Sequence, residues 1–112
     1  MLDLPADHLA EVRRLLRAHL PGCRVCAFGS RVTGKARRFS DLDLAVMTEM
    51  PLDWRALETL KDAFAESDLP FMVDVLDWAI TAETFRRAIS PQLVMVQEAV
   101  DALSESNLKE LV

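Results

Sequence analysis

The sequence predicts an α/β (α+β) fold, with a short mixed β-sheet of three to four strands flanked by helices. Two observations predict it: the order of helical and strand-like stretches along the sequence, and the length of the chain, which limits the sheet to one small domain. Stretches with apolar residues at helical spacing alternate with short apolar runs, in the order helix, strand, turn, strand, helix, strand, helix. The chain has 112 residues, enough for one compact domain and too few for two. We therefore expect residues 1–112 to form a single domain.

The composition is that of a globular protein, with 51% hydrophobic and 28% charged residues. No apolar run approaches the roughly 20 residues of a membrane span. The N-terminus carries charge from Asp3 onward, unlike a secretory signal, so we expect a cytoplasmic protein that does not enter membranes. The net charge of −5 argues against direct binding to nucleic acid, which depends on many cationic contacts to phosphates.

The first helix is expected over residues 5–19, where apolar side chains recur at helical spacing. After a Pro-Gly break, residues 23–28 read as a short apolar strand. Cys23 and Cys26 lie in this strand as a lone CxxC pair. With no second pair for a zinc site and no helix N-terminus to activate a thiol, we expect both to be buried structural thiols.

The middle of the chain is expected to form a turn, a strand and a helix. Residues 30–38 read as a turn or one short helix. Residues 41–48 read as a strand whose second half is apolar on both faces, which indicates a central place in the sheet. Asp53 is the expected N-cap of a helix over residues 54–66.

The last third of the chain is expected to add a strand over residues 71–77 and a helix over residues 82–89. Thr81 is the expected cap of that helix. Residues 92–103 are apolar-rich and are expected to form a short strand running into a helix. Residues 104–112 read as a polar tail.

The first candidate site residues are two acids at the start of the middle strand. Alternation along the strand places Asp41 and Asp43 on the same face, close enough to raise one another's pKa. A divalent cation would remove that penalty, and magnesium prefers carboxylate and phosphate oxygens. The pair therefore predicts a magnesium site for phosphoryl or nucleotidyl transfer.

A third acid is expected on a neighbouring strand, facing the same way. The segment FMVDVLD offers Asp74 and Asp77, which are three positions apart and so face opposite sides of a regular strand. Asp74 lies between two valines inside the strand, where an unpaired carboxylate is costly. Asp77 lies at the end of the strand, where solvation or capping is enough to explain it. We therefore assign Asp74 to the site.

Gly29 and Ser30 end the preceding strand and have the character of an anion site. A glycine lets the backbone approach a ligand closely, and a helical turn starting at Ser30 would direct free N–H groups at a phosphate. Four cations precede the acid pair, and two readings stay open for them: a solvated loop that balances local acids, or a basic collar for a phosphorylated ligand. They are Arg31, Lys35, Arg37 and Arg38.

Gly29-Ser30, ten further residues and then Asp41-Leu42-Asp43 resembles the GS-x10-DxD signature of the nucleotidyltransferase superfamily, which includes DNA polymerase β and the aminoglycoside nucleotidyltransferases. The chain length and the VDVLD segment are similar to those of its smallest branch, the minimal nucleotidyltransferases. The resemblance runs from the first helix to about residue 100. It implies a nucleotidyltransferase fold that binds ATP and two magnesium ions in its cleft.

The resemblance also implies roles for the site residues. The acids expected to bind metal and to act in catalysis are Asp41, Asp43 and Asp74. The residues expected to contact the nucleotide are Gly29, Ser30 and Arg31. The cations expected to neutralise charge that develops during transfer are Arg31, Lys35 or Arg38.

A partner protein is implied as well. Members of this branch are commonly encoded with a helical HEPN-domain toxin, and those resembling this chain act as antitoxins by transferring AMP from ATP to a tyrosine of the toxin. The chain contains no tyrosine, so a tyrosine acceptor must belong to another molecule. Because the sequence shows no extra acceptor-binding domain, we expect a second protein to complete the cleft.

Two other functions remain open at this point. One is an antitoxin that blocks the toxin by binding alone, with the acids as a relic or holding a structural ion. The intact signature acids favour the enzyme over that reading. The other is transfer to a small molecule such as an antibiotic, which the lack of an acceptor-binding domain disfavours.

Overall fold

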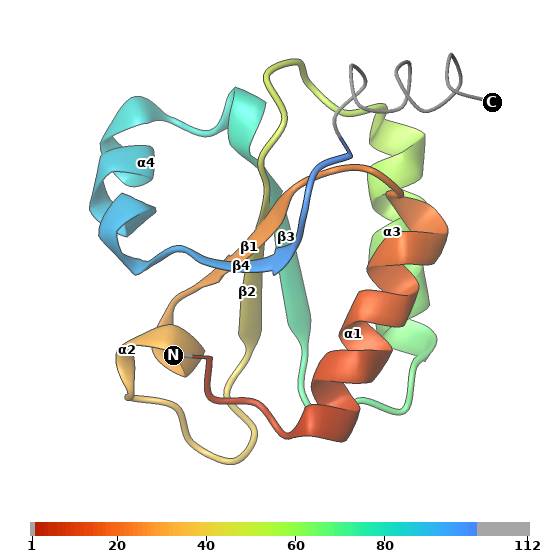
Figure 1. The fold of residues 1–112 in the computed structure, drawn as a ribbon, viewed down its shortest axis with the longest axis vertical. Helices are drawn as coiled ribbons and strands as arrows, with labels where there is room; N and C mark the ends of the chain where they lie inside the picture. Colours follow the sequence, from red (N-terminus) through yellow and green to blue (C-terminus); the bar gives the residue numbers. More distant parts are fainter. Residues whose placement is uncertain (1, 101–112) are drawn as a thin grey trace, which may run out of the picture.

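The computed structural model describes residues 2–100 of the chain, and Figure 1 shows them as a sheet with helices on both sides. The elements follow the predicted alternation of helices and strands. They are α1 (Ala6–His19), β1 (Val25–Phe28), α2 (Ser30–Thr33), β2 (Leu42–Val46), α3 (Trp54–Glu66), β3 (Val73–Asp77), η1 (Trp78–Ile80), α4 (Glu83–Ile89), η2 (Ser90–Gln92) and β4 (Val94–Gln97).

The four strands form one mixed sheet in the order β3-β2-β1-β4. β2 runs parallel to β3, whereas β1 runs antiparallel to both β2 and β4. The predicted mixed sheet flanked by helices is therefore confirmed, and so is the central place of the strand that carries Asp43. Within residues 2–100, β3 is an edge strand of this sheet.

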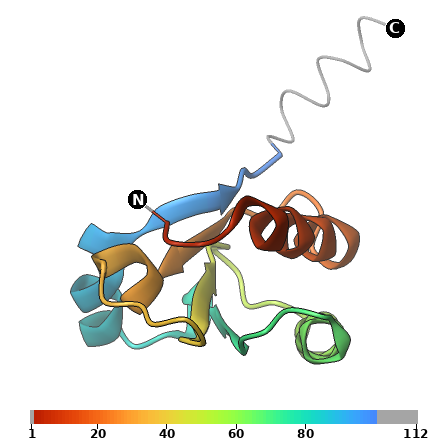
Figure 2. The same ribbon diagram turned by 90° about the horizontal axis from the view of Figure 1, so that it is seen from below.

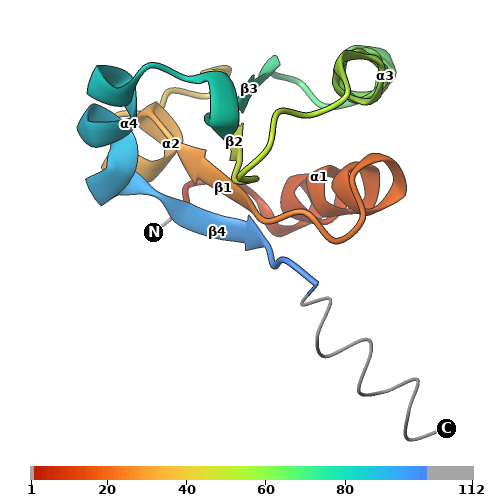
Figure 3. The same ribbon diagram turned by 90° about the horizontal axis from the view of Figure 1, so that it is seen from above.

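The two faces of the sheet are covered differently. Leu42, Leu44 and Val46 alternate along β2 and pack into the main core against α1 and α3. On the opposite face, Ala45 packs with Phe28 and with Ile89 of α4 in a smaller cluster. Figure 3 shows α1 and α3 together on one side of the strands and α4 on the other.

Helix ends follow the sequence at α3 but not at α4. Asp53 caps α3 as predicted, since its side chain accepts a hydrogen bond of 3.0 Å from the Arg55 main-chain N–H. The prediction that Thr81 caps the next helix is wrong. Its hydroxyl donates to the main-chain oxygen of Asp77 at 2.7 Å, and Ala82 occupies the N-cap position.

The region predicted as a strand running into a helix contains β4, so the strand is confirmed. Residues 98–100 are not helical, and residues 101–112, with the predicted polar tail, lie outside the described residues. Cys26 is buried as predicted, whereas Cys23 is only half-buried, and both thiols are free. Among residues 2–100, no helix combines the length and apolar character needed to cross a membrane.

Candidate active site

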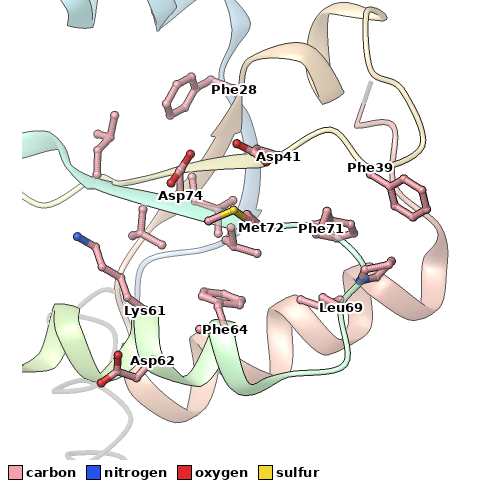
Figure 4. A pocket seen from close by; sticks show the side chains of 16 residues that line it. Phe28, Phe39, Asp41, Lys61, Asp62, Phe64, Leu69, Phe71, Met72 and Asp74 are labelled. Carbon is pink, nitrogen blue, oxygen red and sulfur yellow. The ribbon is translucent and has the colours of Figure 1, made fainter.

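Asp43 and Asp74 lie directly opposite each other on adjacent strands. The parallel pairing of β2 with β3 matches Asp43 with Asp74, and side chains of paired residues lie on the same face of a sheet. Asp41 precedes Asp43 by two positions, just before β2 begins, and so belongs to the same side. In Figure 4 the carboxylates of Asp41 and Asp74 both lie on the side of the strands that carries Phe28.

Asp77, the other acid of β3, has a structural role. It is 5% exposed, and its carboxylate accepts hydrogen bonds from the main-chain N–H groups of Leu52 at 2.9 Å and Ala79 at 3.1 Å. Those bonds hold the loop before α3 and the start of η1. Asp74 is exposed and is left as the acid that faces Asp43.

The three carboxylates repel one another. The pKa of Asp43 is raised above its ordinary value, chiefly by burial and then by the negative charges of Asp74 and Asp41. The ion pairs found within residues 2–100 involve none of these acids. An ionised Asp43 therefore costs free energy here unless a cation binds beside it.

The carboxylates suit magnesium in their chemistry, since hard oxygen ligands from one face of a sheet are the donors that this ion prefers. They are not gathered into a finished metal cluster: within the part of the chain that the structure describes, no three Asp, Glu, His or Cys side chains are placed to hold an ion.

Gly29 lies against the Asp43 carboxylate at the point where β1 ends. Its φ is +84°, a left-handed conformation that glycine adopts at little cost. A Cβ at this position would overlap the Oδ2 atom of Asp43. The glycine of the GS turn is therefore required twice, once for its backbone angle and once for its contact with the central acid.

The first turn of α2 leaves two amides available to a ligand. The Gly29 carbonyl accepts hydrogen bonds from the N–H groups of Val32 at 3.0 Å and Thr33 at 3.1 Å. Within the described residues, the N–H groups of Ser30 and Arg31 have no partner, as is usual for the first residues of a helix. These two amides and the Ser30 hydroxyl lie at the start of α2, next to the glycine that contacts Asp43.

Arg31 does not lie where a phosphate ligand was expected. It is 4% exposed, and its guanidinium lies over the Phe71 ring, 4.4 Å from the centroid. Its nitrogens donate to the main-chain oxygens of Ser40, Asp3 and Arg38 at 2.9, 3.1 and 3.2 Å. These bonds tie the loop before the acid pair to the N-terminal segment, which lies against α2 (Figure 2).

The side chain of Arg31 is thus occupied by main-chain carbonyls, so its guanidinium has a structural role, and only its main-chain N–H is left for the expected contact with a nucleotide. The other three cations of the predicted collar are exposed: Lys35, Arg37 and Arg38. Of these, Arg38 stacks on the ring of Phe39, 5.2 Å from the centroid.

A cavity of about 960 Å³ opens beside the acids, between β3 and α3. Asp41 and Asp74 lie at one side of it, and Lys61 and Phe64 of α3 line the other, as Figure 4 shows. Its size is in the range of small-molecule sites in proteins. The acids therefore border a space large enough to admit a ligand.

Gln92 is a site residue that sequence reasoning missed. Its side-chain Oε1 accepts a hydrogen bond of 2.9 Å from the Gly29 N–H. The two residues are far apart in the chain, and a glutamine in an apolar-rich segment carries no signal of such a contact. Only the pairing of β4 with β1 brings them together.

The fold and this site define a class of protein: an α/β nucleotidyltransferase, with a GS turn at one strand end and acids on the two strands beside it. Comparison with known families agrees. The sequence model described as "Polymerase beta, Nucleotidyltransferase" matches residues 16–99. The chain belongs to this polymerase β-type nucleotidyltransferase family.

The chain is also similar to a curated protein, the probable protein adenylyltransferase MntA of Haemophilus influenzae. The two are 53% identical over 97 residues, which cover 87% of this chain and 85% of that protein.

Solved toxin–antitoxin complexes have the same fold. Two of them, one of a mutant MntA complex and one with AMP-PNP, match with TM-scores of 0.67 and 0.59 at 25% and 26% identity, each covering 81% of this chain and 73% of the solved chain. A complex of a tri-AMPylated Shewanella oneidensis HEPN toxin with its MNT antitoxin matches with a TM-score of 0.53 at 22% identity, covering 89% and 75%, which shows likeness of fold alone.

Proposed function

We propose that this nucleotidyltransferase transfers AMP from ATP to a tyrosine hydroxyl of a HEPN toxin and so acts as the antitoxin of a toxin–antitoxin pair. The observation that carries the proposal is the pairing of Asp43 with Asp74 on the face where the Gly29-Ser30 turn ends β1. The relative named as a probable protein adenylyltransferase supports the reaction. The similar complex that contains AMP-PNP supports ATP as the donor.

In this proposal two Mg²⁺ ions are held by Asp41, Asp43 and Asp74, and when bound they offset the negative charge of the triphosphate. The free amides of Ser30 and Arg31, with the Ser30 hydroxyl, receive the β and γ phosphates. Gly29 has no side chain, and this leaves room for the Asp43 carboxylate beside the turn. The exposed collar cations, Lys35 or Arg38, neutralise charge on the departing group.

The transfer is a single in-line displacement at the α phosphorus. The acceptor oxygen forms a bond to that phosphorus as the bond from phosphorus to the bridging α–β oxygen breaks, and pyrophosphate leaves with the bonding electrons. The proton of the acceptor hydroxyl passes to Asp74, which is exposed and so is reachable by an incoming acceptor.

The acceptor comes from a partner protein in this proposal. The chain has no tyrosine of its own. The solved complexes that share its fold pair an antitoxin with a toxin, and one of the toxins carries AMP groups. We take residues 1–112 as a single minimal nucleotidyltransferase domain that acts in the cytoplasm, where ATP is abundant.

The test compares two acid-to-amide variants for transfer of labelled AMP to a co-purified HEPN toxin. Asp43→Asn is expected to lower the rate by more than about 100-fold, because even residues that only support a metal ligand change activity by 10- to 100-fold. The matched control is Asp68→Asn, at an exposed acid outside the site, which should label the toxin at the wild-type rate. Mass spectrometry should place the AMP on a tyrosine.

Two outcomes would contradict the proposal. Labelling by Asp43→Asn at the wild-type rate would show that this acid has no part in transfer. Neutralisation of the toxin by Asp43→Asn without labelling would support an antitoxin that acts by binding alone.

A further inference from the structure

Gln92 contacts the GS turn from a distant part of the chain. Its Oε1 accepts a hydrogen bond from the main-chain N–H of Gly29 at 2.9 Å, in a partly buried position and across 63 residues of sequence. The contact joins the end of η2 to the turn that begins α2. It is a link between the segment that follows α4 and the candidate anion site.

The pairing of β1 with β4 explains why Gln92 reaches this position. The ladder pairs Cys26 with Met95 and Ala27 with Val94. Continued by two residues in the same register, it would place Gly29 opposite Gln92. The chain turns through η2 at that point, so the backbone ladder stops at Val94. The side-chain oxygen of Gln92 takes the place of the backbone carbonyl that the next rung would supply.

This hydrogen bond completes the fixation of Gly29. The carbonyl of Gly29 is already used by the N–H groups of Val32 and Thr33, and its own N–H is used by Gln92. Both main-chain groups of Gly29 are therefore held while its Cα lies against Asp43. The next two amides, of Ser30 and Arg31, are left for an anion.

We propose that Gln92 is a positioning residue for the triphosphate: through Gly29 it fixes the GS turn, so that the Ser30 and Arg31 amides point at the phosphates beside Asp43. The inference rests on the proposed function and adds to it a residue outside the signature motif. It also assigns Gly29 a role different from that of a phosphate donor. Its N–H serves the turn and not the ligand.

The test measures binding of AMP-PNP with Mg²⁺ by calorimetry and, in parallel, thermal unfolding of the whole chain. Gln92→Leu removes the acceptor while keeping a side chain of similar size. Its dissociation constant is expected to rise about tenfold, the factor by which one lost hydrogen bond changes an equilibrium.

The matched control is Gln97→Leu at the other end of β4. The Gln97 side chain also bonds main chain, donating from Nε2 to the carbonyls of Leu20 and Cys23 at 2.8 Å each. This variant should lower the unfolding temperature as Gln92→Leu does, yet bind AMP-PNP within twofold of the wild type. Equal dissociation constants for the two leucine variants would overturn the inference.

Gln92→Glu provides a second measurement that does not depend on the first variant folding. It keeps an oxygen acceptor for the Gly29 N–H, so its unfolding temperature should match that of the wild type. Because the bond that fixes the GS turn is kept, its dissociation constant should stay closer to the wild-type value than that of Gln92→Leu. A dissociation constant as high as that of Gln92→Leu would overturn the inference.

The failures of the two ideas can be told apart. If the wild-type chain does not bind AMP-PNP with Mg²⁺, the proposed function fails together with the inference. If the wild type binds and Gln92→Leu binds equally well, only the positioning role fails.

Discussion

The two faces of β2 are made by one five-residue strand, yet they differ in almost every physical respect. On the helix-covered face, Leu42, Leu44 and Val46 are each 0% exposed and pack against α1 and α3. On the acid-bearing face, Asp43 lies among other carboxylates, and α4 covers only the part of the sheet near Ala45. Alternation along a strand lets one segment serve both purposes.

The comparison teaches where stability and chemistry are located in so small a domain. Burial of hydrocarbon on the helix-covered face stabilises the fold. The acid-bearing face carries a repulsion between carboxylates that opposes folding, which the other face must outweigh. A change on one face should therefore alter mainly stability, and a change on the other mainly transfer.

The largest effect on stability is expected from Leu60→Ala, in α3 on the helix-covered face. Leu60 is 0% exposed and belongs to the main core. Its truncation should lower the free energy of unfolding by about 2–5 kcal/mol, measured by urea denaturation. The half-buried Leu57 of the same helix is the control, and Leu57→Ala should cost less. A large fall in transfer rate per folded molecule of Leu60→Ala would show that the two faces are not separate.

The next effect is expected from Gly29→Ala, at the border of the acid-bearing face. Gly34→Ala is its matched control, because Gly34 has a similar φ of +81° but no atom within 4 Å of its missing Cβ. Gly34→Ala should lose roughly 1–2 kcal/mol of stability through left-handed strain, and Gly29→Ala should lose more, because its ψ of −157° lies in a region that is essentially restricted to glycine. Only Gly29→Ala should displace Asp43, and a shift of about 1 Å can lower transfer about 100-fold. Equal activity of the two variants would contradict the contact.

The sequence was sufficient for features that depend on local periodicity. The face shared by Asp41 and Asp43 follows from the two-residue repeat of any strand. The choice of Asp74 over Asp77 used the same repeat, and the structure pairs Asp74 with Asp43 while giving Asp77 two main-chain partners. The family signature then supplied the chemistry, which periodicity alone does not contain.

Features that depend on distant carbonyls were not predictable. Arg31 has the sequence appearance of a phosphate ligand, but the carbonyls that take its donors come from a loop and from the N-terminal segment. Thr81 was expected to cap α4, and the Asp77 carbonyl took its hydroxyl instead. Gln92 depended on the register of β4 with β1. In each case the competing partner is fixed only once the tertiary fold has formed.

The smallest effect, and the sharpest test of the acid-bearing face, is the titration of Asp43 followed by NMR in the metal-free chain. Its pKa should lie above that of an ordinary aspartate, since burial is the main cause and the charges of Asp74 and Asp41 add to it. Asp74→Asn should therefore lower the pKa of Asp43 more than Asp41→Asn does, and the double variant should leave it raised by burial.

Because the folded chain holds this proton more tightly than the unfolded chain, Asp43 favours folding at low pH and loses that contribution as the pH rises through its raised pKa. Asp62→Asn, at an exposed acid across the cavity, is the control and should leave the titration unchanged. If Asp74→Asn had no more effect than this control, the carboxylates would not face one another. The acid-bearing face would then differ from the other face only in being less covered by helices.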